Sequence, residues 1–302
     1  MKKVALALAS GGPRGFAYIG AIEELLARGY EISSIAGASA GSLVGGIYAA
    51  GGLEAFKQWL FDLDPVKVMT LMDVSVSRSY LVKGERVINE IKARVPEVNI
   101  QDLPIPFTAV ATDLYTGEEV LFREGPLFEA IRASISIPSM FKPVEWKGRT
   151  LVDGGMVNTF PLNRVARTEG DILVGFNVNQ IDAAEIQGYL DSLAAISRES
   201  DHSLLGRIQA GLQTRQLEES GRQNWIPVDA SDNFYTVLQR SFGIMNCSLS
   251  RMGIELTPPD VLISLPYDSY HGVYGYSHAR EIAELGRRLT AEALDAYEKK
   301  HA

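Results

Sequence analysis

An uninterrupted apolar run near the start of the chain, Val4 to Leu8, constrains the fold more than any other feature. The run leaves no polar face for solvent, so a strand formed here must be covered on both sides. Strands of this kind are typical of parallel sheets with helices packed on both faces. The loop Ser10-Gly11-Gly12-Pro13-Arg14-Gly15 follows and can turn the chain from this strand into a helix.

The same order of elements repeats up to Ala50. Phe16 to Arg28 carries apolar residues at helical spacing and is stopped by Gly29. Ile32 to Ala36 is a second short apolar strand, and Ser42 to Ala50 continues as a second helix. This opening predicts the α/β class with a parallel, doubly wound sheet.

The rest of the chain adds further strands and helices. Strands are expected at Phe107–Ala111, Glu119–Phe122, Thr150–Val152, Ile172–Phe176 and Val261–Leu265. Helices are expected at Leu127–Ser134, Phe234–Met252 and His278–Lys299, with Leu53–Leu81 helical or irregular and two helices in Ala183–Gly221. We expect one domain over residues 1–302, with a motif-bearing core at about 4–165 and a mainly helical part at about 183–302.

Composition narrows the classes of partner. The chain has 29 Lys and Arg against 37 Asp and Glu, a net charge of −8, which argues against nucleic acid because phosphate binding needs clustered cations. Cys247 is the only cysteine, so a Cys-rich zinc site is excluded, and without a calcium-loop motif we expect no metal or other cofactor. MKKVALALAS resembles a signal peptide, but its apolar run is very short, and no stretch is long enough to span a bilayer. We therefore expect a cytoplasmic protein.

The second strand runs into Gly37-Ala38-Ser39-Ala40-Gly41, which has the spacing of a nucleophile elbow. In that motif a strand, a sharp turn and a helix expose a serine hydroxyl, and small neighbours permit a strained backbone. The helix N-terminus also favours developing negative charge. An ordinary glycine-rich turn can carry the same letters, so Ser39 is a candidate nucleophile that needs support from the rest of the chain.

The loop after the first strand is the candidate oxyanion hole. Neighbouring strands would place it beside the elbow, where Gly11 and Gly12 can expose backbone N–H groups to a developing charge. Pro13 has no N–H, and Arg14 would either bind an anionic substrate or brace the loop. A phosphate-binding turn is the competing interpretation, although no Gly-Lys-Ser/Thr follows and Ser10 occupies the first glycine position of GxGxxG.

A serine nucleophile needs a base. None of the four histidines precedes residue 202, and His271 and His278 follow the last expected strand. An α/β-hydrolase triad of Ser39, Asp153 and one of these two is therefore an alternative. The early position of the elbow disfavours it, because that fold runs through several strands first. Asp153 has a competing interpretation of its own, since Asp-Gly is a common turn signal.

Four blocks together resemble the patatin-like phospholipase family, and within it the short bacterial members of the neuropathy-target-esterase-like branch. The blocks are SGGPRGFAYIG (Ser10–Gly20), GASAGS (Gly37–Ser42), ASISIPSMFKPV (Ala133–Val144) and DGGMVNTFP (Asp153–Pro161). They are spread over about half the chain. The resemblance implies a three-layer α/β fold with a central, mostly parallel sheet flanked by helices.

The resemblance also implies a Ser-Asp dyad without histidine. Ser39 would be the nucleophile and Asp153 its base, with the acyl group passing to Ser39 and then to water. An unperturbed carboxylate is a weak base, so burial would have to raise the pKa of Asp153. The remaining implied site residues are Gly11, Gly12, Arg14 and Gly15 in the oxyanion hole, Gly37 and Gly41 in the elbow, and Gly154 and Gly155 in the Asp loop.

Several residues around this site have supporting or divergent roles. Many relatives have glycine where Ser10 stands and a small residue where Pro13 stands, which puts the oxyanion assignment in question. Asn158 and Pro161 are expected to position the Asp loop. Ser134, Ser136 and Ser139 are expected to support the site.

For substrate, the resemblance implies a carboxylic ester, with phospholipids or lysophospholipids as the class. A non-catalytic member that binds lipid or a regulatory partner is an alternative, but such a protein needs neither Ser39 nor Asp153. The apolar residues from Trp59 to Met72 would form either a lid or lipid-contact surface, giving peripheral membrane contact, or a buried helical core.

Overall fold

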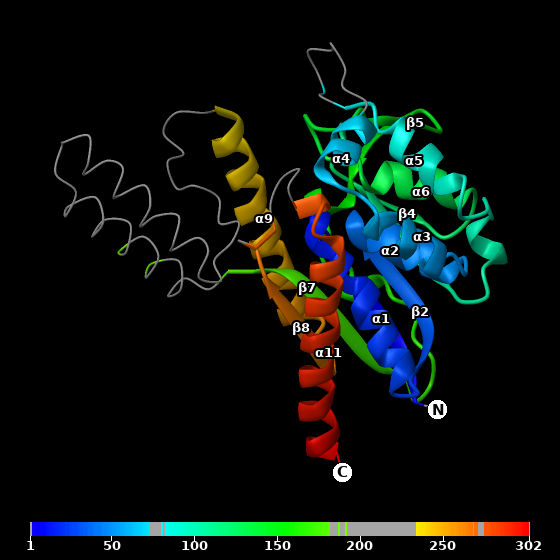
Figure 1. Cartoon of the computed structure of the whole chain (residues 1–302), viewed down its shortest axis with the longest axis vertical. Helices are drawn as coiled ribbons and strands as arrows, with labels where there is room; N and C mark the ends of the chain where they lie inside the picture. Colours follow the sequence, from blue (N-terminus) through cyan, green and yellow to red (C-terminus); the bar gives the residue numbers. More distant parts are fainter. Residues whose placement is uncertain are drawn as a thin grey trace.

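Figure 1 shows a computed structural model of the chain. It describes residues 2–72, 80, 82–181, 187, 191, 234–267, 269–270 and 275–301. The two helices expected between Ala183 and Gly221 lie almost entirely outside these residues, as does His271.

One sheet of eight strands forms the centre of the described part, in the order β5-β6-β3-β2-β1-β7-β8, with β4 paired to β3. The strands β3, β2, β1, β7 and β8 run parallel, and β4, β5 and β6 are paired antiparallel. Their bounds are β1 Lys3–Leu8, β2 Glu31–Ala38, β3 Phe107–Asp113, β4 Glu119–Phe122, β5 Val144–Trp146, β6 Arg149–Asp153, β7 Ile172–Gln180 and β8 Val261–Pro266. The expected strands are thus present, and the expected hairpin is the β3–β4 pair.

The described helices are α1 Ala17–Ala27, α2 Ala40–Ala49, α3 Leu53–Phe61, α4 Pro65–Leu71, α5 Glu85–Lys92, α6 Leu127–Ser134, α9 Phe234–Leu256 and α11 Ala279–His301. Short 3-10 turns are η1 Gly12–Phe16, η2 Ile100–Asp102, η3 Gly154–Met156 and η4 Leu162–Arg164. Among the described residues, no helix is both long and apolar enough to cross a bilayer.

Neighbouring residues of β7 show how the two faces of the sheet are covered. Phe176 packs edge-on against Tyr18 of α1, with ring centroids 5.2 Å apart. A Cβ on the neighbouring Gly175 would point to the other face of the sheet, towards the ring of Phe160. The carbonyl oxygen of Phe160 in turn lies 3.4 Å from the position that a Cβ on Gly253 of α9 would take. The helices α1, α2, α6 and α11 therefore lie on one side of the sheet and α9 on the other, as Figure 1 shows. This is the expected three-layer α/β arrangement.

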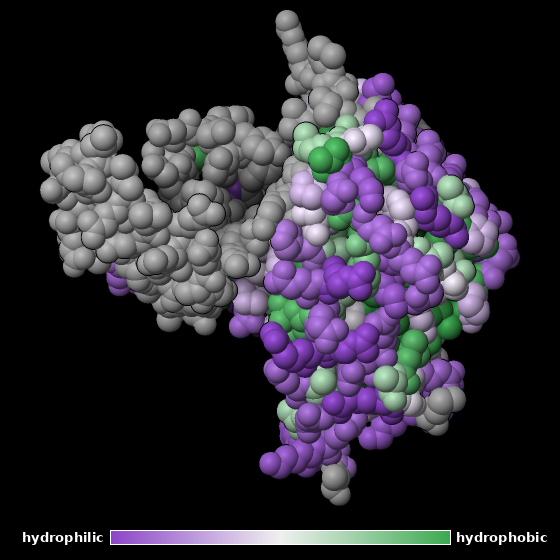
Figure 2. Space-filling view, viewed as in Figure 1, coloured by the Kyte–Doolittle hydropathy of each residue, from purple (hydrophilic) through white to green (hydrophobic). Residues whose placement is uncertain are grey.

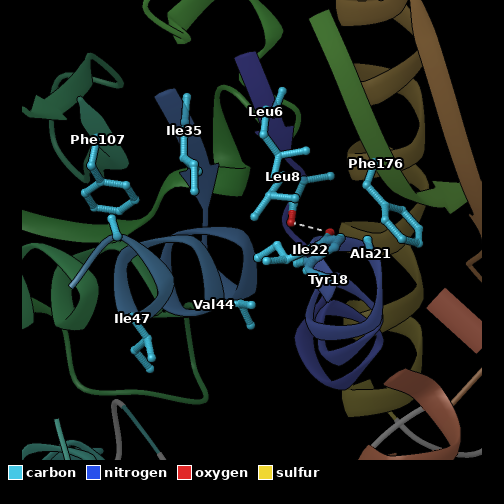
Figure 3. Packing of buried hydrophobic residues seen from close by; sticks show 14 of the residues in the cluster. Leu6, Leu8, Tyr18, Ala21, Ile22, Ile35, Val44, Ile47, Phe107 and Phe176 are labelled. Carbon is cyan, nitrogen blue, oxygen red and sulfur yellow. Dashed lines mark hydrogen bonds between the residues drawn. The ribbon is translucent and has the colours of Figure 1, made fainter. Parts of the chain in front are cut away.

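The core explains why the apolar run of β1 forms a strand. Leu6 and Leu8 are fully buried and point to the same face, towards α1 and α2 (Figure 3). Ile35 of β2 lies next to them and so close to α2 that a Cβ on Gly45 would be 2.7 Å from its side chain. Burying each such side chain contributes about 1.5–3 kcal/mol. The two-sided burial that the sequence predicts is therefore present.

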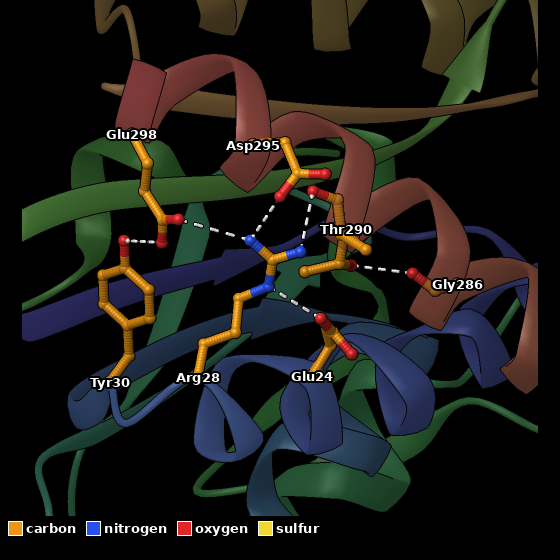
Figure 4. A network of polar contacts seen from close by, with 8 residues as sticks. Glu24, Arg28, Tyr30, Gly286, Thr290, Asp295 and Glu298 are labelled. Atoms are coloured by element: carbon orange, nitrogen blue, oxygen red, sulfur yellow. Dashed lines mark hydrogen bonds and ion pairs between the residues drawn. The ribbon is translucent and has the colours of Figure 1, made fainter. Parts of the chain in front are cut away.

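The helices α1 and α11 meet at two glycines. A Cβ on Gly20 would lie 1.9 Å from the carbonyl oxygen of Ala283, and one on Gly286 would lie 2.0 Å from that of Ala17. At the end of the seam, Arg28 donates to Glu24, Asp295 and Glu298, as Figure 4 shows. We call this contact the α1–α11 seam.

Helix bounds near the site differ from expectation. The first helix begins at Ala17 because Gly12–Phe16 form a 3-10 turn, and α2 begins at Ala40, directly after Ser39. The helix α5 was not expected at all; its eight residues are too short for a strong periodic signal. The last helix spans Ala279–His301 where His278–Lys299 was expected.

Candidate active site

Ser39 lies between the end of β2 and the start of α2. It is buried and adopts φ 51° and ψ −121°, a conformation that a residue with a side chain rarely takes. Its N–H donates to Ser134 Oγ at 2.9 Å, and its carbonyl accepts from Ser42 Oγ at 2.7 Å. Ser134 in turn donates to the carbonyl of Val110 at 2.6 Å. Hydrogen bonds on both sides thus hold the strained turn in place.

The two glycines of the elbow are required by packing. A Cβ on Gly37 would lie 2.3 Å from the backbone carbon of Gly41. A Cβ on Gly41 would lie 2.2 Å from the carbonyl oxygen of Leu8. Any side chain at either position would push α2 away from β1 and β2, so the turn that presents Ser39 needs both glycines.

Asp153 ends β6 and faces the elbow from a distant part of the sequence. Its Oδ1 accepts the N–H of Gly155 at 2.7 Å, and its own N–H donates to the carbonyl of Ser136 at 2.9 Å. Its Oδ2 is buried and has no hydrogen-bond partner among the described residues. The Ser39 hydroxyl acts on this carboxylate, so the elbow and the Asp loop meet here although they are more than a hundred residues apart.

The environment of Asp153 changes its acidity. Burial raises its pKa from 3.8 to about 6, while the Ser39 hydroxyl, the Gly155 N–H and the Ser10 hydroxyl each lower it and offset part of this rise. Both hydroxyls lower the pKa of the carboxylate, although neither forms a hydrogen bond with its Oδ2. A carboxylate with this pKa is a stronger base than an ordinary Asp and is still mostly ionised at neutral pH.

The glycine-rich loop lies against the same site. Gly12 has φ +57°, the left-handed region that favours glycine, and it lines the same cavity as Ser39. Among the described residues, no acceptor for the N–H groups of Gly11 or Gly12 is present, so both groups are available. Arg14 Nε donates to the carbonyl of Val178 at 2.9 Å, and its guanidinium lies over the Tyr267 ring. The side chain of Arg14 therefore braces the loop.

The other residues of the loops also fall near the site. Gly15 packs against Ala40, and a Cβ on Gly154 would lie 2.1 Å from the carbonyl oxygen of Val110. Asn158 donates to Glu119 at 2.7 Å, which ties the Asp loop to β4. The expected residues of the oxyanion loop, the elbow and the Asp loop are thus all described, and they lie in or next to the turns that carry Ser39 and Asp153.

An apolar cavity of about 110 Å³ opens beside Ser39. Apart from Gly12, Ser39, Ala40 and Tyr276, its lining consists of large apolar side chains from η1, α2, α3, α4, α5 and residues 135–141, together with Leu63, Met72 and Val82. Leu60 is 3% exposed, so the expected patch between Trp59 and Met72 is mainly a cavity wall.

No histidine is among the groups that act on Asp153. His278 lies just before α11, next to Ser277 and Tyr270, and is not among the residues that line the cavity. His271 lies outside the described residues. Within the described residues, no cluster of three His, Cys, Asp or Glu side chains could hold a metal ion.

Comparison with known families agrees with this geometry. A family model described as patatin-like phospholipase matches residues 6–166, which hold the glycine-rich loop, the elbow and the Asp loop. The chain belongs to the patatin-like phospholipase family. Membership of this family identifies it as a lipid acyl hydrolase and gives lipids as its substrate class.

Two uncharacterised NTE family proteins, from Mycobacterium bovis and Mycobacterium tuberculosis, resemble this patatin-like chain throughout. Each is 33% identical over 335 aligned residues, covering 98% of this chain and 92% of the relative. Patatin-like phospholipase domain-containing protein 7 of Rattus norvegicus is 28% identical and covers 63% of this chain but 15% of the relative. The solved structure of VipD from Legionella pneumophila matches with a TM-score of 0.48 and 14% identity, over 98% of this chain and 67% of that one.

Some features of this patatin-like site were not foreseen from the sequence. The wall that α5 gives to the cavity has no motif of its own, and the block Ala133–Val144 was not expected to line it. Asn179 donates to the carbonyl of Ser10 at 2.7 Å, although it follows Ser10 by 169 positions. Ser134 was expected only as general support, whereas its hydroxyl holds the N–H of the nucleophile. Contacts between distant segments leave no local signal in the sequence.

Proposed function

We propose that this chain is a serine acyl hydrolase that cleaves lipid carboxylic esters with a Ser39–Asp153 dyad, in the manner of a phospholipase A or lysophospholipase. One observation carries the proposal: a strained, buried serine and a buried carboxylate with a raised pKa converge beside an apolar cavity. A binding protein would not need a nucleophile in a strained turn or a carboxylate of this acidity.

In the first step, Ser39 Oγ attacks the ester carbonyl carbon and its proton passes to Asp153. The carbonyl oxygen becomes negatively charged and is stabilised by the free N–H groups of Gly11 and Gly12 and by the N-terminus of α2. The carbon–oxygen bond to the alcohol then breaks, and the alcohol leaves with the proton from Asp153. This gives an acyl-enzyme on Ser39 and returns Asp153 to its carboxylate form.

In the second step, Asp153 takes a proton from a water molecule, which attacks the acyl-enzyme. Ser39 recovers its proton from Asp153 as the fatty acid leaves. One base serves both steps, because the two half-reactions are chemically similar.

The apolar cavity beside Ser39 is suited to bind the acyl chain of the substrate. Its lining is dominated by Leu, Val, Ile, Met and aromatic side chains, and Ser39 lies in its wall. An acyl chain lying in the cavity brings its ester to Ser39 and leaves the polar head group outside. Burial of each methylene contributes about 0.8 kcal/mol, so longer acyl chains bind better until the cavity is full.

We assign peripheral membrane contact to α4. Its residues Val68 and Leu71 line the cavity, as does Met72 directly after it, while Val66 is 75% exposed and Met69 is 54% exposed. Figure 2 shows apolar side chains gathered where Figure 1 places α4. A helix that is apolar on both sides at the cavity wall can lie on a lipid surface and pass an acyl chain inward.

Sedimentation with phospholipid vesicles tests this contact. The double substitution Val66→Ser and Met69→Ser should reduce the bound fraction several-fold and lower activity on vesicles more than on monomeric esters. Leu256→Ser, at an 82% exposed site on α9, is the matched control. Equal binding by all three proteins would contradict the contact.

Active-site labelling tests the dyad. A fluorophosphonate probe should label wild-type protein at Ser39, and a panel of esters with short, medium and long acyl chains should be hydrolysed. Asp153→Asn should lower kcat/KM by at least about a thousandfold, whereas His278→Ala should keep wild-type activity. Failure to label folded protein at Ser39 would refute the enzyme mechanism, and loss of activity in folded His271→Ala or His278→Ala protein would favour a histidine base.

A further inference from the structure

Ser10 follows β1 and is held on both sides of its peptide. Its N–H donates to the carbonyl of Thr159 at 2.8 Å, and its carbonyl accepts from Asn179 Nδ2 at 2.7 Å. Thr159 Oγ1 also donates to the carbonyl of Gly155 at 2.7 Å. Ser10 is 5% exposed, so its hydroxyl lies inside the protein between the glycine-rich loop and the Asp loop.

The space beside this hydroxyl belongs to the Asp loop. A Cβ on Gly155 would lie 2.6 Å from Ser10 Oγ and 3.0 Å from Asp153 Oδ1. The Ser10 hydroxyl and the Asp153 carboxylate therefore border the same point in space. Gly155 leaves room for Ser10, and Ser10 fills it with a hydrogen-bond donor.

Few groups can compensate the buried charge of Asp153. The groups that act on it are the Ser39 hydroxyl, the Gly155 N–H and the Ser10 hydroxyl. No charged side chain is among them, although several ionisable residues lie on β6 and on the elements packed against it and the Asp loop. These are Asp113 on β3, Glu129 and Arg132 on α6, Glu145 on β5, Arg149 on β6, and Arg240, Cys247, Arg251 and Glu255 on α9.

We propose that Ser10 is a positioning residue for Asp153: its hydroxyl, which borders Gly155 and the buried carboxylate, solvates that charge and keeps the carboxylate aimed at Ser39. The inference rests on the proposed Ser39–Asp153 dyad. Ser39 gives up its own proton during the reaction, so its hydroxyl cannot stabilise the carboxylate throughout. The Ser10 hydroxyl keeps its proton through both steps and can stabilise the carboxylate whenever it is charged.

The pH dependence of the reaction reports this role. A hydroxyl that donates to the charged form lowers the pKa of the carboxylate, so its removal raises that pKa. The active form of the enzyme has ionised Asp153, and the acid limb of kcat/KM against pH follows this ionisation. Ser10→Ala and Ser10→Gly should therefore move the acid limb to higher pH by about half a unit to one unit, the effect expected of one hydrogen bond.

The test measures kcat/KM for an acyl ester and the rate of fluorophosphonate labelling, each across the pH range, for wild type, Ser10→Ala and Ser10→Gly. Ser33→Ala is the matched control, because its hydroxyl donates to the carbonyl of Val4 at the other end of β1. Two variants at position 10 are used because either one can test the inference if the other does not fold. Thermal unfolding shows which of them is folded. The expected result is an upward shift of both pH profiles in the Ser10 variants only.

Two outcomes would overturn the inference: an acid limb that does not move in folded Ser10 variants, or an equal shift in Ser33→Ala. The Asp153→Asn protein separates this from failure of the dyad. If Asp153→Asn keeps wild-type turnover, the proposed function fails. If Asp153→Asn is inactive while the Ser10 profiles match wild type, only the role of Ser10 fails.

Discussion

The region around Ser39 and Asp153, which we call the corner, and the α1–α11 seam use glycines and charged side chains in opposite ways. At the corner, glycines let a helix approach two strands so that Ser39 is held in a strained turn and Asp153 is buried without a charged partner. At the seam, glycines let two helices touch, and the charges of Arg28 and its carboxylates are paired. The backbone strain at Ser39 and the buried charge of Asp153 destabilise the fold, and contacts elsewhere, such as those of the seam, offset this cost.

The largest effect is expected at the seam. Gly20→Ala places a Cβ 1.9 Å from a backbone oxygen, so α11 must move away from α1. We expect a loss of about 3 kcal/mol in the free energy of unfolding, measured by urea denaturation. The control is Gly253→Ala on α9, where the nearest contact of the new Cβ is 3.4 Å and helix propensity favours alanine by up to about 1 kcal/mol. Equal effects of the two substitutions would contradict the tight seam.

At the corner, removing the charge should stabilise the protein. Asp153 has a folded pKa of about 6 against 3.8, so the folded state binds its proton more tightly than the unfolded state. This group therefore gives its full stability below about pH 4 and loses it as pH rises towards 6, a cost of roughly 3 kcal/mol. Asp153→Asn should raise the free energy of unfolding at pH 8 by up to about that amount and should have little effect at pH 4. The same gain at both pH values would show that the buried charge is not the cause.

The backbone strain at Ser39 should appear as a smaller gain. Ser39→Gly removes the side chain that makes φ 51°, ψ −121° unfavourable, whereas Ser39→Ala keeps its Cβ. The glycine variant should be about 1 kcal/mol more stable than the alanine variant, because relief of strain exceeds the entropy that glycine adds to the unfolded chain. Both variants should be inactive. Thermal unfolding of the pair gives the difference, and an alanine variant at least as stable as the glycine variant would argue against strain.

The smallest effect is expected for the charges of the seam. Arg28 is partly exposed, and its partner Asp295 has a side chain that is 68% exposed, so water and salt screen the pair. Arg28→Met keeps much of the stem and should cost about 1 kcal/mol or less, with the difference shrinking at high salt. Urea denaturation at low and high salt measures it. A loss much above this would mean that the charges, and not the glycines, hold the seam together.

The comparison also explains which parts of the molecule the sequence predicts. The strand β1 and the elbow are predictable because a run of apolar residues and a glycine spacing are local patterns. The pairing of Ser39 with Asp153 in a dyad without histidine followed only from the resemblance of several blocks to a family, since nothing local to either residue points to the other. Family membership is confirmed, whereas the dyad stays a prediction.

Other parts of the site depend on the folded chain. The raised pKa of Asp153 comes from burial, which three groups on separate segments offset only in part, and no sequence pattern encodes that combination. The helix α5 was missed because eight residues give weak periodicity, yet its Val87 and Ile91 form part of the cavity wall. The apolar stretch around Leu60 is ambiguous in sequence, because a cavity wall and an exposed surface can have the same composition.

The packing of Gly37 and Gly41 affects how active and inactive relatives are told apart from their sequences. Both glycines are set by the distance between α2 and the strands beneath it, and neither requirement depends on the hydroxyl of Ser39. A descendant that lost its nucleophile would still need both glycines in order to fold. A sequence search for the two glycines therefore finds proteins with this fold. The presence of serine at the position of Ser39 is what separates an active enzyme from an inactive homologue.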